Sequence, residues 1–234
     1  MSGGGGAHTL LIPLVGPMQA WGSRSRFDDR DTHPEPTKSG VIGLICAAMG
    51  RGREADLSDL NALRFGVRVD APGRAETDYH TAQDVMRASG SGGAAVTSRR
   101  HYLADARFLV GLSGDDLKLL LYIEGHLKNP FWTLSLGRKS FPLSVPPYLP
   151  QGSVRENVGL EQALKDEPWR ALRRREERPK QLRMIIETPE GDAVQSDLPL
   201  SFAWDNRAFG LRRFTAYPVT LPPDENNKEN LWIP

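Results

Sequence analysis

The sequence lacks several features that would assign it at once to a class of protein. It has one cysteine, Cys46, among 234 residues, which excludes an internal disulfide framework and fits a reducing cytoplasm. Its longest apolar run, residues 41–49, is about half the length that a helix needs to span a bilayer. A hydrophobic content of 39% is enough for a buried core, so we expect a globular, cytoplasmic protein without a membrane segment.

Common catalytic and metal-binding motifs are missing as well. Thr37-Lys-Ser39 is similar to the end of a phosphate-binding P-loop, but that motif needs glycine at positions 32 and 37, and both are threonine. The five histidines have no ligand spacing, one cysteine cannot build a zinc site, and no Gly-x-Ser-x-Gly segment occurs. We therefore expect neither a metal ion nor another cofactor.

Ribonuclease chemistry is not excluded by these absences, because RNA can be cut without a metal. A base activates the 2′-hydroxyl group, and cations stabilise the charged intermediate. Arg99-Arg-His-Tyr102 contains the residue types that this reaction needs. His101 and His80 are the candidate general bases, and the sequence cannot show whether the required groups converge.

The net charge is only +1, but the charges are unevenly distributed. Residues 85–104, 130–155 and 206–223 each carry three bases and no acid, and residues 170–183 carry seven bases and two acids. One such run alone is more simply a solvated face. Together, the runs indicate a basic groove that attracts phosphate on a protein of nearly neutral charge.

The pattern of apolar residues predicts an ordered series of elements in the first part of the chain. The expected elements are strands at 8–15, 65–70, 79–86, 96–103, 106–112 and 131–136, and helices at 41–49, 56–63 and 115–127. The Gly/Ser-rich segment between the third and fourth strands indicates a protruding hairpin, or thumb, with a flexible tip. The remaining succession fits a ferredoxin-like β-α-β-β-α-β unit within an α+β fold.

The rest of the chain is less regular. A helix is expected at 157–169, a hairpin of strands at 182–187 and 193–196, and a last strand at 212–221. We therefore predict three parts: a flexible tail at 1–7, a ferredoxin-like domain at 8–150 with its thumb at about 84–104, and a smaller, irregular β-rich extension at 151–234.

Several short motifs, in this order, resemble those of the CasD family, a subunit of the type I-E CRISPR Cascade complex within the RAMP superfamily. The motifs are Gly16-Pro-Met-Gln-Ala-Trp-Gly22, Pro36-Thr-Lys-Ser-Gly40, Asp78-Tyr-His-Thr-Ala-Gln83, Ser98-Arg-Arg-His-Tyr-Leu-Ala-Asp105 and Leu136-Gly-Arg-Lys-Ser140. The resemblance covers roughly residues 8–155 and is specific in combination. Beyond residue 155 it is weak.

The resemblance implies a function in antiviral defence. The family is similar to an RNA-recognition-motif fold with a thumb, and it holds the 5′ handle of the guide RNA at one end of the complex. Its implied partners are the guide RNA, the backbone RAMP subunit and the large subunit that reads the PAM, with target DNA met indirectly. In the type I-E branch another subunit cuts the precursor RNA, so the resemblance implies a binding subunit without catalysis.

The candidate RNA-binding residues combine aromatic faces, polar side chains and bases, as recognition of single-stranded RNA requires. They are Gln19, Trp21, Arg24, Arg26, Lys38, Ser39, Arg99, Arg100, His101, Tyr102, Gly137, Arg138, Lys139 and Ser140. Trp21 and Tyr102 offer faces for stacking, although Trp21 also fits a core position. Gly137 permits close backbone approach beside Arg138 and Lys139.

Three hypotheses remain open from the sequence. The first is a non-catalytic subunit that clamps the 5′ handle of the guide RNA. The second is a metal-independent endoribonuclease that processes repeat RNA. The third is a protein-interaction subunit whose basic runs meet acidic partners.

Overall fold

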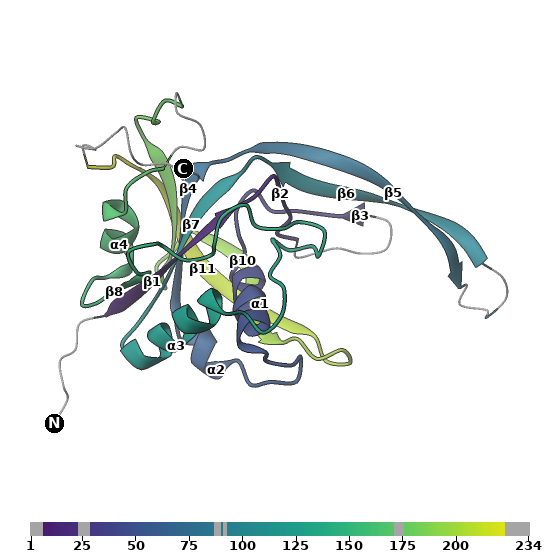
Figure 1. Ribbon diagram of the computed structural model, residues 1–234, viewed down its shortest axis with the longest axis horizontal. Helices are drawn as coiled ribbons and strands as arrows, with labels where there is room; N and C mark the ends of the chain where they lie inside the picture. The colour runs from purple at the N-terminus through teal and green to yellow at the C-terminus, as the bar shows by residue number, and fades with distance from the viewer. Residues whose placement is uncertain (1–6, 23–28, 87–89, 91–92, 171–175, 223–234) are drawn as a thin grey trace.

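The computed structural model describes residues 7–22, 29–86, 90, 93–170 and 176–222 (Figure 1). The strands are β1 (His8–Val15), β2 (Met18–Gln19), β3 (Asp29–Arg30), β4 (Arg64–Ala71), β5 (Arg74–Met86), β6 (Gly93–Ala104), β7 (Arg107–Gly114), β8 (Val154–Arg155), β9 (Leu182–Glu187), β10 (Ala193–Ser201) and β11 (Ala208–Val219). The helices are α1 (Lys38–Met49), α2 (Ser58–Asn61), α3 (Leu117–Lys128) and α4 (Leu160–Asp166). Within this part of the chain, no helix is long and apolar enough to cross a membrane.

The succession β1-α1-β4-β7-α3-β8 has the β-α-β-β-α-β order of a ferredoxin-like unit, which confirms the predicted α+β class. Its strands pair in the order β4-β7-β1-β8. Local signals set the helix ends. The Thr37 hydroxyl group accepts a hydrogen bond from the N–H of Gly40 at the start of α1, and Gly50 ends that helix with φ of 70°. Asp116 caps α3 in the same way, by accepting from the N–H of Leu119.

The fourth strand of this unit is β8, so the predicted strand at 131–136 is wrong. That segment lies against the end of α1 instead of joining the sheet. The N–H groups of Phe131 and Trp132 donate to the carbonyl oxygens of Ala48 and Ala47, at 2.8 and 3.2 Å. Carbonyl groups in the last turn of a helix lack partners within the helix, and this contact with residues distant in sequence satisfies two of them.

The C-terminal strands extend the same sheet. The seven-stranded order is β10-β11-β9-β4-β7-β1-β8, so β11 lies between β9 and β10. The predicted hairpin of 182–187 with 193–196 is therefore wrong, because both strands pair with β11. The division of the chain at residue 150 stays a prediction, and strands from both sides of it share one sheet.

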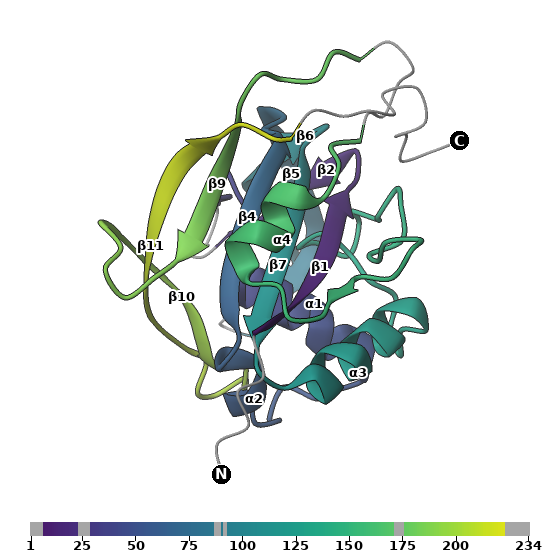
Figure 2. The same ribbon diagram turned by 90° about the vertical axis from the view of Figure 1, so that its left-hand side faces the viewer.

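Both faces of the sheet are covered at its central strands β1, β4 and β7. Leu10, Ile12 and Leu14 of β1 pack in the core beneath α1 and α3, whereas Leu11 packs in a second core with α4. All eight residues of β1 are consequently buried, as expected for a strand with no open face. Figure 2 looks onto the face that α4 covers.

A facing pair of glycines brings α4 close to the sheet. Gly66 and Gly111 lie opposite each other on β4 and β7. A Cβ atom on Gly111 would lie 2.6 Å from a methyl group of Leu160, and one on Gly66 would lie 3.0 Å from a methyl group of Leu164. An RNA-recognition motif binds bases on its open sheet face, and here α4 occupies that face. The central strands therefore offer no open face of this kind, and the thumb is the prominent feature outside the sheet (Figure 1).

The thumb is formed by β5 and β6, which pair along nearly their whole length and extend well away from the body (Figure 1). Its strands start at Arg74 and end at Ala104. Residues 87–89, 91 and 92 of the predicted flexible tip lie outside the described residues, as do residues 1–6 of the predicted flexible tail, whereas residues 93–96 belong to β6.

Candidate nucleic-acid interface

The predicted basic residues Arg99 and Arg100 lie at the root of the thumb. This thumb root is the part of β6 from Arg99 to Ala104, where β6 also pairs with the short strands β2 and β3. β2 pairs with β6 at Leu103 and Ala104, and β3 pairs with it at Arg99 and Arg100. Arg99 is exposed and Arg100 is half-buried. These two bases therefore stand on a four-stranded sheet, which fixes their backbone positions before any ligand binds.

The ring of His101 is held by both of its nitrogen atoms. Its Nε2 atom lies 3.0 Å from Oδ1 of Asp29 on β3, and its Nδ1 atom lies 2.9 Å from Oγ1 of Thr77 on β5. These contacts join three strands of the thumb root. The side chain of His101 therefore holds β3, β5 and β6 together. Its backbone carbonyl oxygen also accepts a hydrogen bond.

That carbonyl oxygen accepts a hydrogen bond of 2.7 Å from Nη2 of Arg138, which also donates to the carbonyl oxygen of Arg30 at 3.3 Å. The guanidinium group of Arg138 lies 5.3 Å from the ring of Phe141, and that ring packs against Tyr102. The basic loop at 136–141 is therefore docked on the thumb root. Tyr102 is committed to this packing, whereas Lys139 and Ser140 are exposed.

Gly137 permits this docking. Its φ is +90°, and a Cβ atom there would lie 1.8 Å from the carbonyl oxygen of Ala20. The N–H of Ala20 in turn donates to the carbonyl oxygen of Leu136 at 3.0 Å. The close approach expected at this glycine is made to the protein's own backbone.

We expect Gly137→Ala to displace the loop from the thumb root. The added methyl group has no room against a backbone oxygen, and a left-handed φ is unfavourable for alanine, so the expected loss of unfolding free energy is about 1–3 kcal/mol. Chemical denaturation checks the stability. Gly52→Ala is the matched control, because its Cβ atom would meet nothing within 4 Å. Equal stability of the two variants would contradict the assigned packing.

Gln19 and Trp21 are buried, at 0% and 1% exposure. The Gln19 side chain donates to the carbonyl oxygens of Leu14 and Ala106 and accepts a hydrogen bond from the indole N–H of Trp21. The indole ring packs on α1 at Gly40, where a Cβ atom would approach it to 2.8 Å. Neither side chain has enough accessible surface to offer RNA a stacking face or a hydrogen bond to a base edge. This corrects their predicted role and supports the core position for Trp21.

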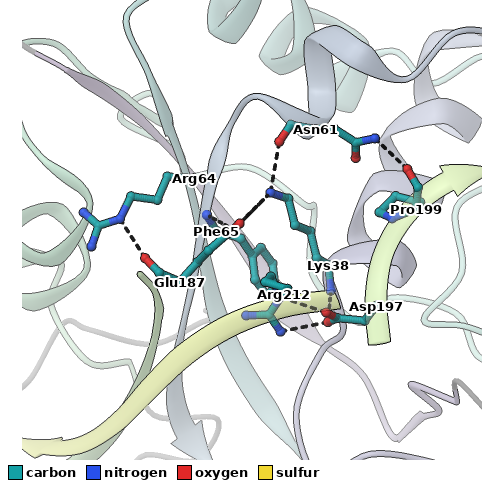
Figure 3. Close-up of polar contacts among 8 residues, drawn as sticks. All are labelled: Lys38, Asn61, Arg64, Phe65, Glu187, Asp197, Pro199 and Arg212. Atoms are coloured by element: carbon teal, nitrogen blue, oxygen red, sulfur yellow. Dashed lines mark hydrogen bonds and ion pairs between the residues drawn. The ribbon is translucent and has the colours of Figure 1, made fainter. Parts of the chain in front are cut away.

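Lys38 begins α1, but its side chain is only 1% exposed. Its Nζ atom donates to the carboxylate of Glu187 at 3.0 and 3.1 Å and to the carbonyl oxygen of Asn61 at 3.1 Å (Figure 3). Burial lowers the pKa of Lys38, and the charge of Glu187 opposes that shift. The prediction that Lys38 contacts phosphate is corrected accordingly, because its ammonium group is enclosed with protein partners.

A cavity of about 260 Å³ opens beside the thumb root, next to the start of α1. Its lining includes the predicted residues Trp21, Ser39, Gly137 and Arg138. It also includes Arg30 and Arg207, which were not among the candidate residues. Arg207 lies in the third acid-free run, residues 206–223, so the charge pattern of the sequence could have identified it as a candidate. The charge pattern could not have identified Arg30, because acidic residues surround it in the sequence.

The electrostatics of this cavity favour an anion. Burial lowers the pKa of Arg138, and the nearby positive charges of Arg100 and Arg30 lower it further. Asp78 and Asp31 act in the opposite direction, and Asp31 is the only acid among the described residues that line the cavity. A phosphate group placed here would relieve the repulsion among the arginines.

Other bases of the acid-free runs have partners that are distant in sequence. Arg212 pairs with Asp197, and Arg155 pairs with Glu167. Arg24 and Arg26 lie outside the described residues. Within the described ranges, no group of three or more histidine, cysteine, aspartate or glutamate side chains is placed to hold a metal ion.

Fold and site together define a ferredoxin-like protein with a β-hairpin thumb and a basic cavity at the thumb root. A family model described as CRISPR-associated protein (Cas_Cas5) matches residues 9–215. The CRISPR system Cascade subunit CasD of Escherichia coli (strain K12) is 35% identical over 157 residues, covering 60% of this chain and 69% of that protein. The chain therefore belongs to the CRISPR-associated Cas5 family, and its resemblance to CasD is confirmed.

Two solved structures match nearly the whole chain. One, described as "Crystal structure of Cas protein", has a TM-score of 0.71 and 42% identity, with 95% of this chain and 97% of the other covered. The second, described as "CRISPR RNA-guided surveillance complex", has a TM-score of 0.76 and 30% identity, with 95% and 96% covered. These matches extend into the C-terminal strands β9, β10 and β11. The sequence motifs that resemble CasD end near residue 155 and did not cover these strands.

Proposed function

We propose that this chain is a non-catalytic, RNA-binding subunit of a type I-E Cascade complex, and that it holds the 5′ handle of the guide RNA at the thumb root. Such a subunit needs to grip only a constant end of the guide, because the target sequence is read by base pairing. Its proposed partners are the backbone RAMP subunit and the large subunit that reads the PAM.

The main support for this proposal is that arginine side chains from separate parts of the chain line one cavity. Arg30 comes from β3, Arg138 from the docked loop and Arg207 from the β10–β11 connection. Arg100 lies beside them on β6, near enough to shift the pKa of Arg138. Contacts of basic side chains with phosphate groups supply much of the affinity for single-stranded RNA, and they fix the position of the RNA.

The nuclease hypothesis is less well supported by the geometry around His101. A general base needs a free nitrogen atom within reach of the 2′-hydroxyl group. Both ring nitrogens of His101 already have partners, in Asp29 and Thr77. These contacts suit a residue that stabilises the thumb root. We therefore favour binding of RNA over cleavage of RNA.

The test is an electrophoretic assay of the purified chain with 5′-labelled repeat RNA, in EDTA, over a range of salt concentrations. We expect retention of intact RNA that weakens steeply as salt rises. A shortened product with a 2′,3′-cyclic phosphate end would instead identify a processing nuclease. Retention that unrelated acidic protein removes but unrelated RNA does not would favour the protein-interaction hypothesis.

A further inference from the structure

A second and larger cavity, of about 360 Å³, adjoins the thumb-root cavity along the outer side of α1. The two cavities share the lining residues Ser39, Gly40, Gly137, Phe202 and Arg207. A strand of RNA held at the thumb root therefore has a direct route into the second cavity, which we call the α1 slot.

The charged residues that line the α1 slot are all arginines. They are Arg51, Arg53 and Arg207, and no acid occurs among the described residues of the lining. Arg51 is paired with Asp59. The guanidinium groups of Arg53 and Arg207 lie over the rings of Trp204 and Phe209, and both residues are exposed, so theirs are the charges that a ligand would meet. The charge of the slot thus favours an anion over a neutral or cationic ligand.

Aromatic side chains also line the slot and are held in place by the surrounding structure. Trp132 is 47% exposed. Its backbone N–H donates to the carbonyl oxygen of Ala47 at the end of α1, and its ring packs edge-on against Phe131, with ring centroids 5.1 Å apart. Phe202 packs edge-on against Phe209, with ring centroids 6.4 Å apart. Rigid aromatic faces beside arginines are the two components that bind single-stranded nucleic acid.

One glycine of the slot is not explained by packing within the protein. Glycine inside a helix is unfavourable relative to alanine. At Gly40 the cost has a reason, because a Cβ atom would collide with Trp21. At Gly43 a Cβ atom would meet only Phe202, at an ordinary distance of 3.9 Å. Glycine at position 43 keeps the slot open, since a longer side chain would extend into it.

We infer that the α1 slot takes one unstacked nucleotide of the guide RNA, with its base against Trp132 and Phe202 and its phosphate near Arg53 and Arg207. This inference rests on the proposed function and adds a base-binding position to it. Thr133 and Ser135 also line the slot, and their hydroxyl groups offer hydrogen bonds to the edge of a base.

The test combines a filled slot with RNAs that lack one base at a time. Gly43→Leu fills the slot and improves helix propensity, and Gly125→Leu is its matched control, because a Cβ atom at Gly125 in α3 meets nothing within 4 Å. Trp132→Ala provides a second variant that removes an aromatic face without filling the slot. Each full-length protein is titrated against 3′-fluorescein-labelled repeat RNA, either intact or with a single abasic position.

For the wild-type protein we expect one abasic position to weaken binding by about tenfold, the size of one base–aromatic stack. Gly43→Leu and Trp132→Ala should weaken binding of intact RNA to a similar extent, and the abasic position should then have no further effect. Gly125→Leu should bind as the wild type does.

Two results would overturn the inference while leaving the proposed function intact. The first is normal binding of intact RNA by Gly43→Leu and Trp132→Ala. The second is normal RNA binding combined with failure of Gly43→Leu to enter the assembled complex, which would assign the slot to a partner protein. Absence of RNA binding by the wild-type chain would instead overturn both proposals.

Discussion

Asp197→Ala is expected to lower the free energy of unfolding by about 3–5 kcal/mol, the usual cost of leaving one charge of a buried ion pair without its partner. Asp197 is fully buried and accepts hydrogen bonds from Nε and Nη2 of Arg212, both at 2.8 Å. It also accepts from the backbone N–H of Lys38, at 2.8 Å, at the start of α1 (Figure 3). Its loss therefore leaves a buried guanidinium group and a helix N–H group without their acceptor.

The measurement is chemical denaturation with a thermal melt, and the expected fall in melting temperature is on the order of 10 °C for a chain of this length. Asp192→Ala, at an exposed position just before the same strand, is the matched control and should be nearly neutral. If Asp197→Ala stays within about 1 kcal/mol of the control, then Asp197 does not stabilise the contact of β10 and β11 with α1.

The second large effect concerns RNA. Replacing Arg99, Arg100 and Lys139 together by alanine is expected to reduce the slope of log affinity against log salt by about 2, since each lost contact with single-stranded RNA removes about 0.7. At a salt concentration of about 0.1 M, that slope corresponds to a loss of affinity of about 100-fold. All three side chains have accessible surface, and two of them stand on the thumb root.

A control with the same change of charge separates local contacts from the field of the whole protein. Lys118, Lys165 and Lys180 are exposed, and none lines either cavity. Their triple replacement should leave the salt slope near that of the wild type. Equal losses in the two triple variants would mean that the thumb root makes no particular contact with RNA.

Features that depend on neighbours in the sequence could be predicted from the sequence alone. The apolar run of β1, the capped helices α1 and α3 and the paired strands of the thumb all follow from short-range patterns. The motifs around Gly16–Gly22 and Leu136–Ser140 pointed to the family for the same reason, because a motif is a local pattern. The ferredoxin-like class followed from the order of the strands and helices up to α3, although the fourth strand of the unit is β8 and not the predicted 131–136.

Only the tertiary structure decided which of the candidate residues face solvent. Lys38 has the composition of a phosphate contact, yet its partner Glu187 lies 149 positions away in the sequence. Arg212 belongs to an acid-free run, yet Asp197 neutralises it across the β10–β11 pair. A sequence shows which charges are present. Burial and pairing depend on contacts between distant segments, and these contacts left the thumb root and the α1 slot as the accessible basic surfaces described above.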